Sequence, residues 1–141
     1  MDRMDYGSYI KTWIGVPLMQ SSWTAGGVPR GGGWGRVQNI IFSNFDLQGA
    51  THATGIMENQ GDNGSYPATS LLEVSNVVFA NFSGYLVTDD TTMSKVKCSY
   101  ARPCYNIDFK NITVFLNNST DQGVGVCNYT LPGAIRGLPG C

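Results

Sequence analysis

The sequence predicts an all-β protein, folded as a right-handed parallel β-helix of several stacked coils. Only 13% of the 141 residues are charged, 18 are Gly, and Val, Ile, Phe, Tyr, Thr and Asn recur in short runs bounded by Gly, Pro, Asn and Ser. This composition is typical of strands joined by tight turns. A nine-residue pattern then occurs three times, as VQNIIFSNF (37–45), VSNVVFANF (74–82) and CYNIDFKNI (104–112).

Each copy of the pattern contains Asn, an aliphatic residue, any residue, Phe, any residue, Asn and a large apolar residue. The apolar positions alternate, which is the period of a strand. Asn39, Asn76 and Asn106 lie 37 and 30 residues apart, as expected if each coil stacks on the last and like residues form ladders. Asn suits the bends because it tolerates left-handed backbone geometry. A Greek-key sandwich is the alternative, but its strands need not repeat a motif.

A second short strand is expected after each copy, near Ile56, Leu86 and Val114. Between coils, residues 58–70 read as a loop insertion. A solenoid also needs capped ends, because an open terminal coil exposes unpaired backbone. The Gly- and Pro-rich segment 125–141 is suited to cap the C-terminal end.

The four cysteines form two close pairs in sequence, Cys98 with Cys104 and Cys127 with Cys141. Local pairing is the simplest of three disulfide connectivities. A bridge from Cys127 to Cys141 would stabilise the cap by roughly 3 kcal/mol. The spacings are not C-x-x-C and the one histidine, His52, is distant, so we expect no metal site.

Glycosylation signals support an extracellular location, as do the paired cysteines. Six asparagines begin an N-x-S/T sequon: Asn63, Asn81, Asn111, Asn117, Asn118 and Asn128. The N-terminus MDRMDYGSYI carries two Asp and one Arg and no apolar segment, so it is not a signal peptide. We therefore expect residues 1–141 to be the C-terminal portion of a longer secreted β-helix domain whose upstream coils are missing.

Other partners are disfavoured by charge and hydropathy. The net charge is −1 and the Lys and Arg residues are scattered, so nucleic acid is not an expected partner. No apolar run reaches the roughly 18 residues of a membrane helix. We expect a monomer.

The segment SYIKTWI (8–14) places one lysine among aromatic residues. In a strand, alternation sends Ile10, Thr12 and Ile14 to one side and Tyr9, Lys11 and Trp13 to the other. A row of aromatic, cation and aromatic residues suits an anionic sugar, because an ammonium pairs with a carboxylate and a ring offers a flat apolar surface. The alternative is a surface lysine whose stem lies across exposed aromatic rings.

Three features together resemble the last third of the polygalacturonases, glycoside hydrolase family 28: the segment GSYIKT (7–12), the Asn-aliphatic-x-Phe coils and the four-cysteine C-terminal end. The nearest resemblance is to the fungal exo-acting members. The resemblance implies a secreted, pectin-lyase-like β-helix that hydrolyses α-1,4-galacturonosyl links with inversion and uses no cofactor. Its partner would be an acidic plant cell-wall polysaccharide, homogalacturonan or a related pectin. The Gly and Lys of the family motif G-x-R-I-K carry over to Gly7 and Lys11, but Tyr9 replaces the Arg. An Arg binds a carboxylate through two parallel hydrogen bonds, and Lys cannot reproduce this arrangement. Thr54 stands before Gly55 where endo-acting members have a substrate-site Tyr.

The family's catalytic N-T-D, D-D and G-H-G motifs lie before the lysine motif, where this chain has only about ten residues. Inversion requires two carboxyl groups, about 6.5 to 9.5 Å apart. Asp89-Asp90 follows the lysine and reads as a solvated loop, and His52 reads as a turn residue without flanking glycines. Coil geometry explains the Asn of the two N-x-D triplets, 44–46 and 106–108. We therefore expect no catalytic residue in this chain, and expect it to be inactive by itself.

Three alternatives compete with this function. A non-catalytic solenoid could bind acidic glycan, and Tyr9 in the Arg position is compatible with rhamnogalacturonan or xylogalacturonan as substrate. A polysaccharide lyase of the same architecture would often need calcium held by clustered carboxylates, and the sequence shows no such acidic cluster.

Overall fold

The computed structural model describes residues 4–17, 31–60, 68–88, 90–117 and 119–141. These residues form eight strands and no helix. Within this part of the chain, therefore, no helix has the length and apolar character needed to cross a bilayer. The strands are β1 (Tyr6–Trp13), β2 (Trp34–Ala50), β3 (His52–Gln60), β4 (Leu71–Leu86), β5 (Thr92–Lys97), β6 (Tyr105–Leu116), β7 (Val124–Asn128) and β8 (Ile135–Arg136).

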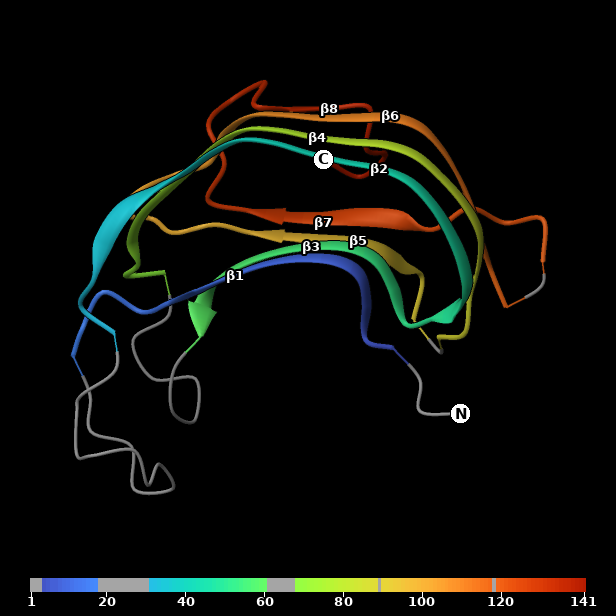
Figure 1. The fold of residues 1–141 in the computed structure, drawn as a ribbon, viewed down its shortest axis with the longest axis horizontal. Coiled ribbons are helices and arrows are strands. Elements are labelled where there is room, and N and C mark those ends of the chain that lie inside the picture. The colour runs from blue at the N-terminus through green and yellow to red at the C-terminus, as the bar shows by residue number, and fades with distance from the viewer. Residues whose placement is uncertain (1–3, 18–30, 61–67, 89, 118) are drawn as a thin grey trace.

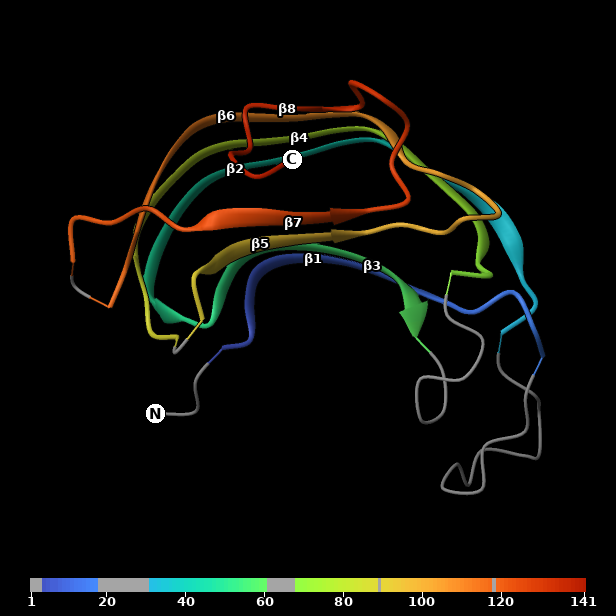
Figure 2. The same cartoon turned by 180° about the vertical axis from the view of Figure 1, so that it is seen from behind.

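The strands alternate between two parallel sheets. One sheet, here the odd sheet, has the order β1-β3-β5-β7, and the other, the even sheet, has the order β2-β4-β6-β8. Figure 1 shows them as two curved layers, and Figure 2 shows the same arrangement from behind. Each odd strand and the following even strand form one coil that stacks in parallel on the next, so the predicted parallel β-helix is confirmed.

The repeated motif forms the centre of the even sheet. Phe42, Phe79 and Phe109 lie in register on β2, β4 and β6. Their ring centroids are 5.4 Å apart for the first pair and 4.9 Å apart for the second. Phe45 stacks on Phe82 in the same way, at 4.7 Å. Inward residues of successive coils therefore fall above one another, as the repeat predicts.

The repeated asparagines form two ladders along the bends. Asn76 donates to Asn39, and Asn106 donates to Asn76. The second ladder consists of Asn44, Asn81 and Asn111, with donor–acceptor distances of 3.0 Å. All six have positive φ, between 53° and 63°, a conformation that Asn tolerates better than other non-Gly residues. The geometry of the coil thus accounts for the Asn of both N-x-D triplets.

Two of the expected second strands are wrong. The strand near Ile56 exists as β3, but the residues near Leu86 and Val114 belong to the long strands β4 and β6. The Asn residues bend these strands without interrupting the ladder of parallel pairs, which runs on to Leu86 and Leu116. The second strands of those coils are β5 and β7, which lie further along the chain and pair with each other in the odd sheet.

The C-terminal segment closes the last coil. Its short strand β8 pairs with β6, and Leu138, only 5% exposed, joins the hydrophobic core. The Gly125 N–H donates to the Pro139 carbonyl. The segment thus covers the end of the core, as predicted for a cap.

Both disulfides join the neighbouring cysteines. Cys98 pairs with Cys104 and Cys127 with Cys141, with Cα atoms 5.7 and 5.6 Å apart. The local connectivity is therefore confirmed, and the second bridge ties the C-terminal cap to β7.

Candidate substrate-binding face

Alternation along β1 places Lys11 on the outer face of the odd sheet. Ile10 and Thr12 are 7% and 4% exposed and point into the core, and the Thr12 hydroxyl lies 3.2 Å from the Ser70 hydroxyl. Lys11 is exposed and Tyr9 is half-buried. The predicted division of this strand into a core side and an outer side is confirmed for these residues.

Trp13 occupies a different environment from Lys11. The pairing of β1 with β3 shifts register between these two residues, with the extra residue on β3. Alternation along β1 continues, because Ile14 is buried like Ile10 and Thr12. Trp13 lines a hollow of about 290 Å³ with Gly31, Gly33 and Leu72, where β1 gives way to the loop before β2. The structure thus brings Tyr9 and Lys11 onto one face and puts Trp13 at its end.

An aromatic stack lies beside Lys11. The Tyr6 ring stacks on Tyr9 with a centroid distance of 4.4 Å and on His52 at 4.8 Å. Gly55 on β3 makes room for the two tyrosines, because a Cβ there would lie 2.6 Å from a Tyr6 ring carbon. Thr54, the residue before it, is 1% exposed and donates to Ser94 inside the core, so it cannot contact a ligand on this face.

Burial changes the titration of this stack. It raises the pKa of Tyr9 to about 12, with smaller contributions from Tyr6 and Asp5. Burial, and then the nearby charge of Lys95, lower the pKa of His52. At neutral pH the phenol is therefore protonated and the imidazole is neutral.

His52 does not lie in a turn as the sequence suggested. It is the first residue of β3 and is 7% exposed. Within the described part of the chain neither ring nitrogen has a hydrogen-bond partner. The stacking on Tyr6 explains its burial, because the ring covers the face of the imidazole.

Two lysines that the sequence analysis missed share this face. Lys95 and Lys97 on β5 are half-buried and alternate with the fully buried Ser94 and Val96, so they point outward. Lys97 lies in register with Met57, which in turn lies in register with Lys11. Only the register reveals this proximity, since 84 residues separate Lys95 from Lys11 in the chain. Adjacent strands are about 4.8 Å apart, so the lysines of β1 and β5 are roughly 10 Å apart at the backbone.

A shallow hollow of about 270 Å³ adjoins Lys97. Besides Lys97 it is lined by Asn59, Asn128 and Tyr129, together with Ala68 and Cys98. Amide, ammonium and phenol groups of this kind are suited to sugar hydroxyl and carboxylate groups. The outer face thus offers hydrogen-bond donors beyond the three lysines.

Carboxylates are scarce on this face. The outward positions of β1, β3, β5 and β7, all in described residues, carry neither Asp nor Glu. Asp90 precedes β5, where its side chain accepts from the Thr92 N–H. Hydrogen bonds from the Thr92 side chain, and then from the backbone, lower the pKa of Asp90. Asp46 and Asp108 lie on the even sheet, and Asp108 pairs with Arg136. Asp89 lies outside the described residues. The face is therefore suited to bind an anion, and the pair of carboxyl groups that inverting hydrolysis requires is not found on it.

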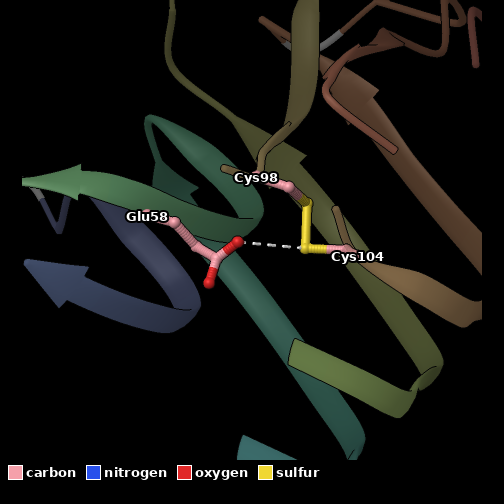
Figure 3. Close-up of side chains that lie close together, drawn as sticks. All are labelled: Glu58, Cys98 and Cys104. Atoms are coloured by element: carbon pink, nitrogen blue, oxygen red, sulfur yellow. Dashed lines mark hydrogen bonds between the residues drawn. A yellow bond between two sulfur atoms is a disulfide. The ribbon is translucent and has the colours of Figure 1, made fainter. Parts of the chain in front are cut away.

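One carboxyl is buried beneath the odd sheet. Glu58 on β3 is fully buried, and its Oε2 accepts from the Ser99 N–H at 2.9 Å. Figure 3 shows this carboxyl directed at the Cys98–Cys104 disulfide, with Oε2 3.4 Å from the Cys104 sulfur. A disulfide sulfur carries no proton to donate, so the contact favours a protonated carboxyl whose O–H points at the sulfur. Burial raises the pKa of Glu58 to about 8, partly offset by the Ser99 N–H.

Glu58 and the two cysteines do not form a metal site in the oxidised protein. Their potential ligand atoms lie within 4.8 Å of one another. The sulfur atoms are bonded to each other, however, and metals bind the thiolate form of cysteine.

The sequons fall in different settings. Asn81 and Asn111 belong to an Asn ladder, and Asn117 makes two hydrogen bonds to the backbone of Thr88. Asn128 is exposed at the end of β7. Asn63 and Asn118 lie outside the described residues.

Comparison with known proteins decides the family. The profile of the family described as "Glycosyl hydrolases family 28" matches residues 29–130, which is most of the chain. The chain belongs to this family. Its two parallel sheets and its stacked coils are thus those of a family 28 β-helix, and the family resemblance predicted from the sequence is confirmed.

Named relatives match most of the chain. Two fungal proteins named "Putative galacturan 1,4-alpha-galacturonidase C", from Aspergillus niger and Neosartorya fischeri, are 47% and 48% identical over 141 residues. Each match covers 99% of this chain and 33% of the relative. "Exopolygalacturonase A" of Aspergillus niger is 31% identical over 125 residues, which cover 84% of this chain and 27% of that protein. The family 28 chain thus spans about a third of the length of these relatives. No solved structure matches it significantly.

Proposed function

We propose that this chain forms the C-terminal part of a secreted pectin-degrading hydrolase and supplies one wall of its substrate-binding surface. The observation that carries the proposal is the outer face of the odd sheet, where Lys11, Lys95 and Lys97 project together and no outward strand position is acidic. A polymer of uronic acids carries one carboxylate on each sugar, so a row of ammonium groups can bind several sugars at once.

Lys11 is proposed to bind a galacturonate carboxylate, with the Tyr6 and Tyr9 rings beside it. A stacked pair of rings offers the sugar a flat apolar surface, and a phenol that stays protonated can donate a hydrogen bond. Because Tyr9 replaces the Arg of the family motif, recognition here depends on single ammonium groups and not on a bidentate fork. Trp13 would contribute only at the end of this surface.

Hydrolysis itself is proposed to need carboxyl groups that lie outside this chain. The relatives are about three times as long, and the edge strand β2 leaves its inward residues only half-buried, which supports further coils stacked on that side. The whole protein would cleave α-1,4-galacturonosyl links with inversion, acting from one chain end. Two disulfides support an extracellular location, and we propose that the protein is a monomer.

Two alternatives remain testable. The chain could belong to a solenoid that binds acidic glycan without cleaving it, which the lack of outward carboxylates on the odd sheet favours. Tyr9 at the Arg position also favours rhamnogalacturonan or xylogalacturonan over plain homogalacturonan.

The test compares binding and cleavage by the purified 141-residue chain. We expect trigalacturonic acid to bind, detected by calorimetry, and we expect no release of galacturonic acid from polygalacturonate. Lys11→Ala should weaken binding about tenfold, the loss typical of one charge-assisted hydrogen bond, and should not affect a neutral trisaccharide. Lys110→Gln, a cation on the even sheet, is the matched control. Release of galacturonic acid would refute the inactive-fragment proposal, and equal binding of the acidic and neutral sugars would refute the carboxylate role.

A further inference from the structure

A third pocket lies on the outer face of the even sheet. It measures about 680 Å³ and is lined by Trp34, Gly35, Arg36, Leu71, Glu73 and Arg102. Trp34 and Arg36 are exposed on β2, with the half-buried Gly35 and Val37 between and after them, so both side chains point away from the core. In register, Trp34 lies beside Leu71 and Arg36 beside Glu73 on β4. The pocket therefore extends across neighbouring coils at the beginning of the even strands, which form the upper layer in Figure 1.

Trp34 stands out by its exposure. Its side chain is 85% exposed, the largest value among the exposed large hydrophobic residues of the described chain. Trp34 lies on the edge strand β2, beside Leu71 in the pocket. Most of the residue is in contact with water, so its indole is available to stack on the apolar face of a ligand ring.

The charges around Trp34 favour an anion. The Arg36 Nε lies 3.8 Å from Glu73 Oε1, and the same oxygen accepts from the Tyr105 hydroxyl at 3.0 Å. Glu73 is therefore shared between two partners. Arg102 has no ion-pair partner among the described residues. The pocket thus holds two guanidinium groups against one carboxylate, and one of the two has a vacant hydrogen-bonding fork.

We propose that this pocket binds a uronic acid unit of an acidic oligosaccharide, with Trp34 against the sugar ring and Arg102 holding the carboxylate. Arg36 assists because its bond to Glu73 is long enough to yield to a better-placed anion. The inference rests on the proposed function, which makes uronic acid polymers the ligand class. It adds a second attachment point on the sheet opposite Lys11, where a polymer can be held while another segment lies on the odd sheet.

A purely apolar partner fits this pocket less well. Covering the pocket with apolar groups would bury the Arg102 guanidinium without a counterion, which is strongly unfavourable. A carboxylated sugar covers the indole and pairs the arginine at the same time. The two features that distinguish the pocket are thus satisfied by one ligand.

The experiment follows the indole N–H of Trp34 by ¹H–¹⁵N NMR in the 141-residue chain, assigned by comparison with Trp34→Phe. We expect trigalacturonic acid to shift this signal in a saturable manner, and the neutral maltotriose and sodium acetate to leave it unchanged at equal concentration. Arg102→Gln should weaken the affinity reported by this signal roughly tenfold, as expected for loss of a charge-assisted bond. Trp34→Ala should weaken overall binding while leaving the fold, checked by circular dichroism, intact.

The controls separate this site from the odd sheet. Lys11→Ala should leave the titration of the Trp34 signal unchanged. Lys11→Ala should also weaken binding by the same factor whether position 102 is Arg or Gln. If trigalacturonic acid binds with a Lys11 dependence but never shifts Trp34, the pocket proposal fails and the proposed function stands. If Trp34 shifts and Lys11→Ala has no effect on binding, the proposed function fails at its lysine. A shift produced equally by acetate or by maltotriose would overturn the assignment to a uronic acid.

Discussion

Strands β2 and β4 carry the same motif but differ in burial. The inward residues Val74, Val77, Phe79 and Phe82 of β4 are 0% exposed. Their register partners on β2 are only partly buried, and these are Val37, Ile40, Phe42 and Phe45. The two strands have nearly the same length, 17 and 16 residues, and share the same alternation and the same Asn bends. Local sequence therefore cannot explain their difference in burial.

The position of each strand in the stack explains the difference. Phe79 stacks on Phe42 on one side and on Phe109 on the other, whereas among the described residues Phe42 stacks on Phe79 alone. In a solenoid, burial comes from the coils above and below as much as from the facing sheet. A motif therefore determines that a strand forms, and its neighbours determine how much that strand stabilises the protein.

The largest predicted effect compares two phenylalanines of the same column. Phe79→Ala should reduce the free energy of unfolding by roughly 3 to 5 kcal/mol, because it leaves a buried cavity that the surrounding side chains cannot fill. Phe42→Ala should cost roughly half as much, because part of its ring is already in contact with water. Urea denaturation of both variants, with Phe→Leu at each site as the volume control, measures the difference. Equal losses would contradict the idea that stacked neighbours set burial.

A second effect, at most comparable with the first, concerns a carboxyl group buried in a central strand of the odd sheet. The pKa of Glu58 is raised from 4.5 to about 8, so folding favours its protonated form. Its contribution to stability is complete below pH 4.5 and is lost as the pH rises toward about 8, by roughly 1.4 kcal/mol for each unit of pKa difference at most. Glu58→Gln should abolish this decline, which thermal unfolding between pH 4.5 and 8.5 would detect. Asp121→Asn removes an exposed carboxylate as the control, and an unchanged decline in Glu58→Gln would show that another group causes it.

The sequence predicted the fold because the information is local and repeated. The Asn and Phe positions of three motifs predict strands, bends and ladders, and the neighbouring cysteines predict their own pairing. The strands β5 and β7 were missed because TMSKVK and VGVCN carry no motif, and because Gly84 and the Asn corners bend β4 without ending it. The register of β1, β3 and β5 brings Lys95 and Lys97 to the face of Lys11. The sequence does not specify this register between residues that are 84 positions apart.

The same limit applies to the aromatic residues. Alternation placed Tyr9 correctly, but Tyr6 reaches the same face because Gly55 on the next strand leaves room for its ring. Trp13 follows the predicted alternation, but the pairing of β1 with β3 shifts register beside it, and no sequence pattern predicts that shift. Side-chain direction within a strand could thus be predicted, whereas contacts between strands could not.

The most direct test of the central claim follows the Met57 methyl group, which lies in register between Lys11 and Lys97. The ¹³C-methyl signal is titrated with galacturonic acid, then with its dimer and trimer. If the stacking of coils joins the lysines into one anion-binding face, the affinity should rise with each added sugar unit. Lys97→Ala should then remove the gain in affinity of the dimer and trimer while leaving monomer binding unchanged. An affinity independent of ligand length, or a loss in Lys97→Ala that is equal for monomer and trimer, would contradict the claim.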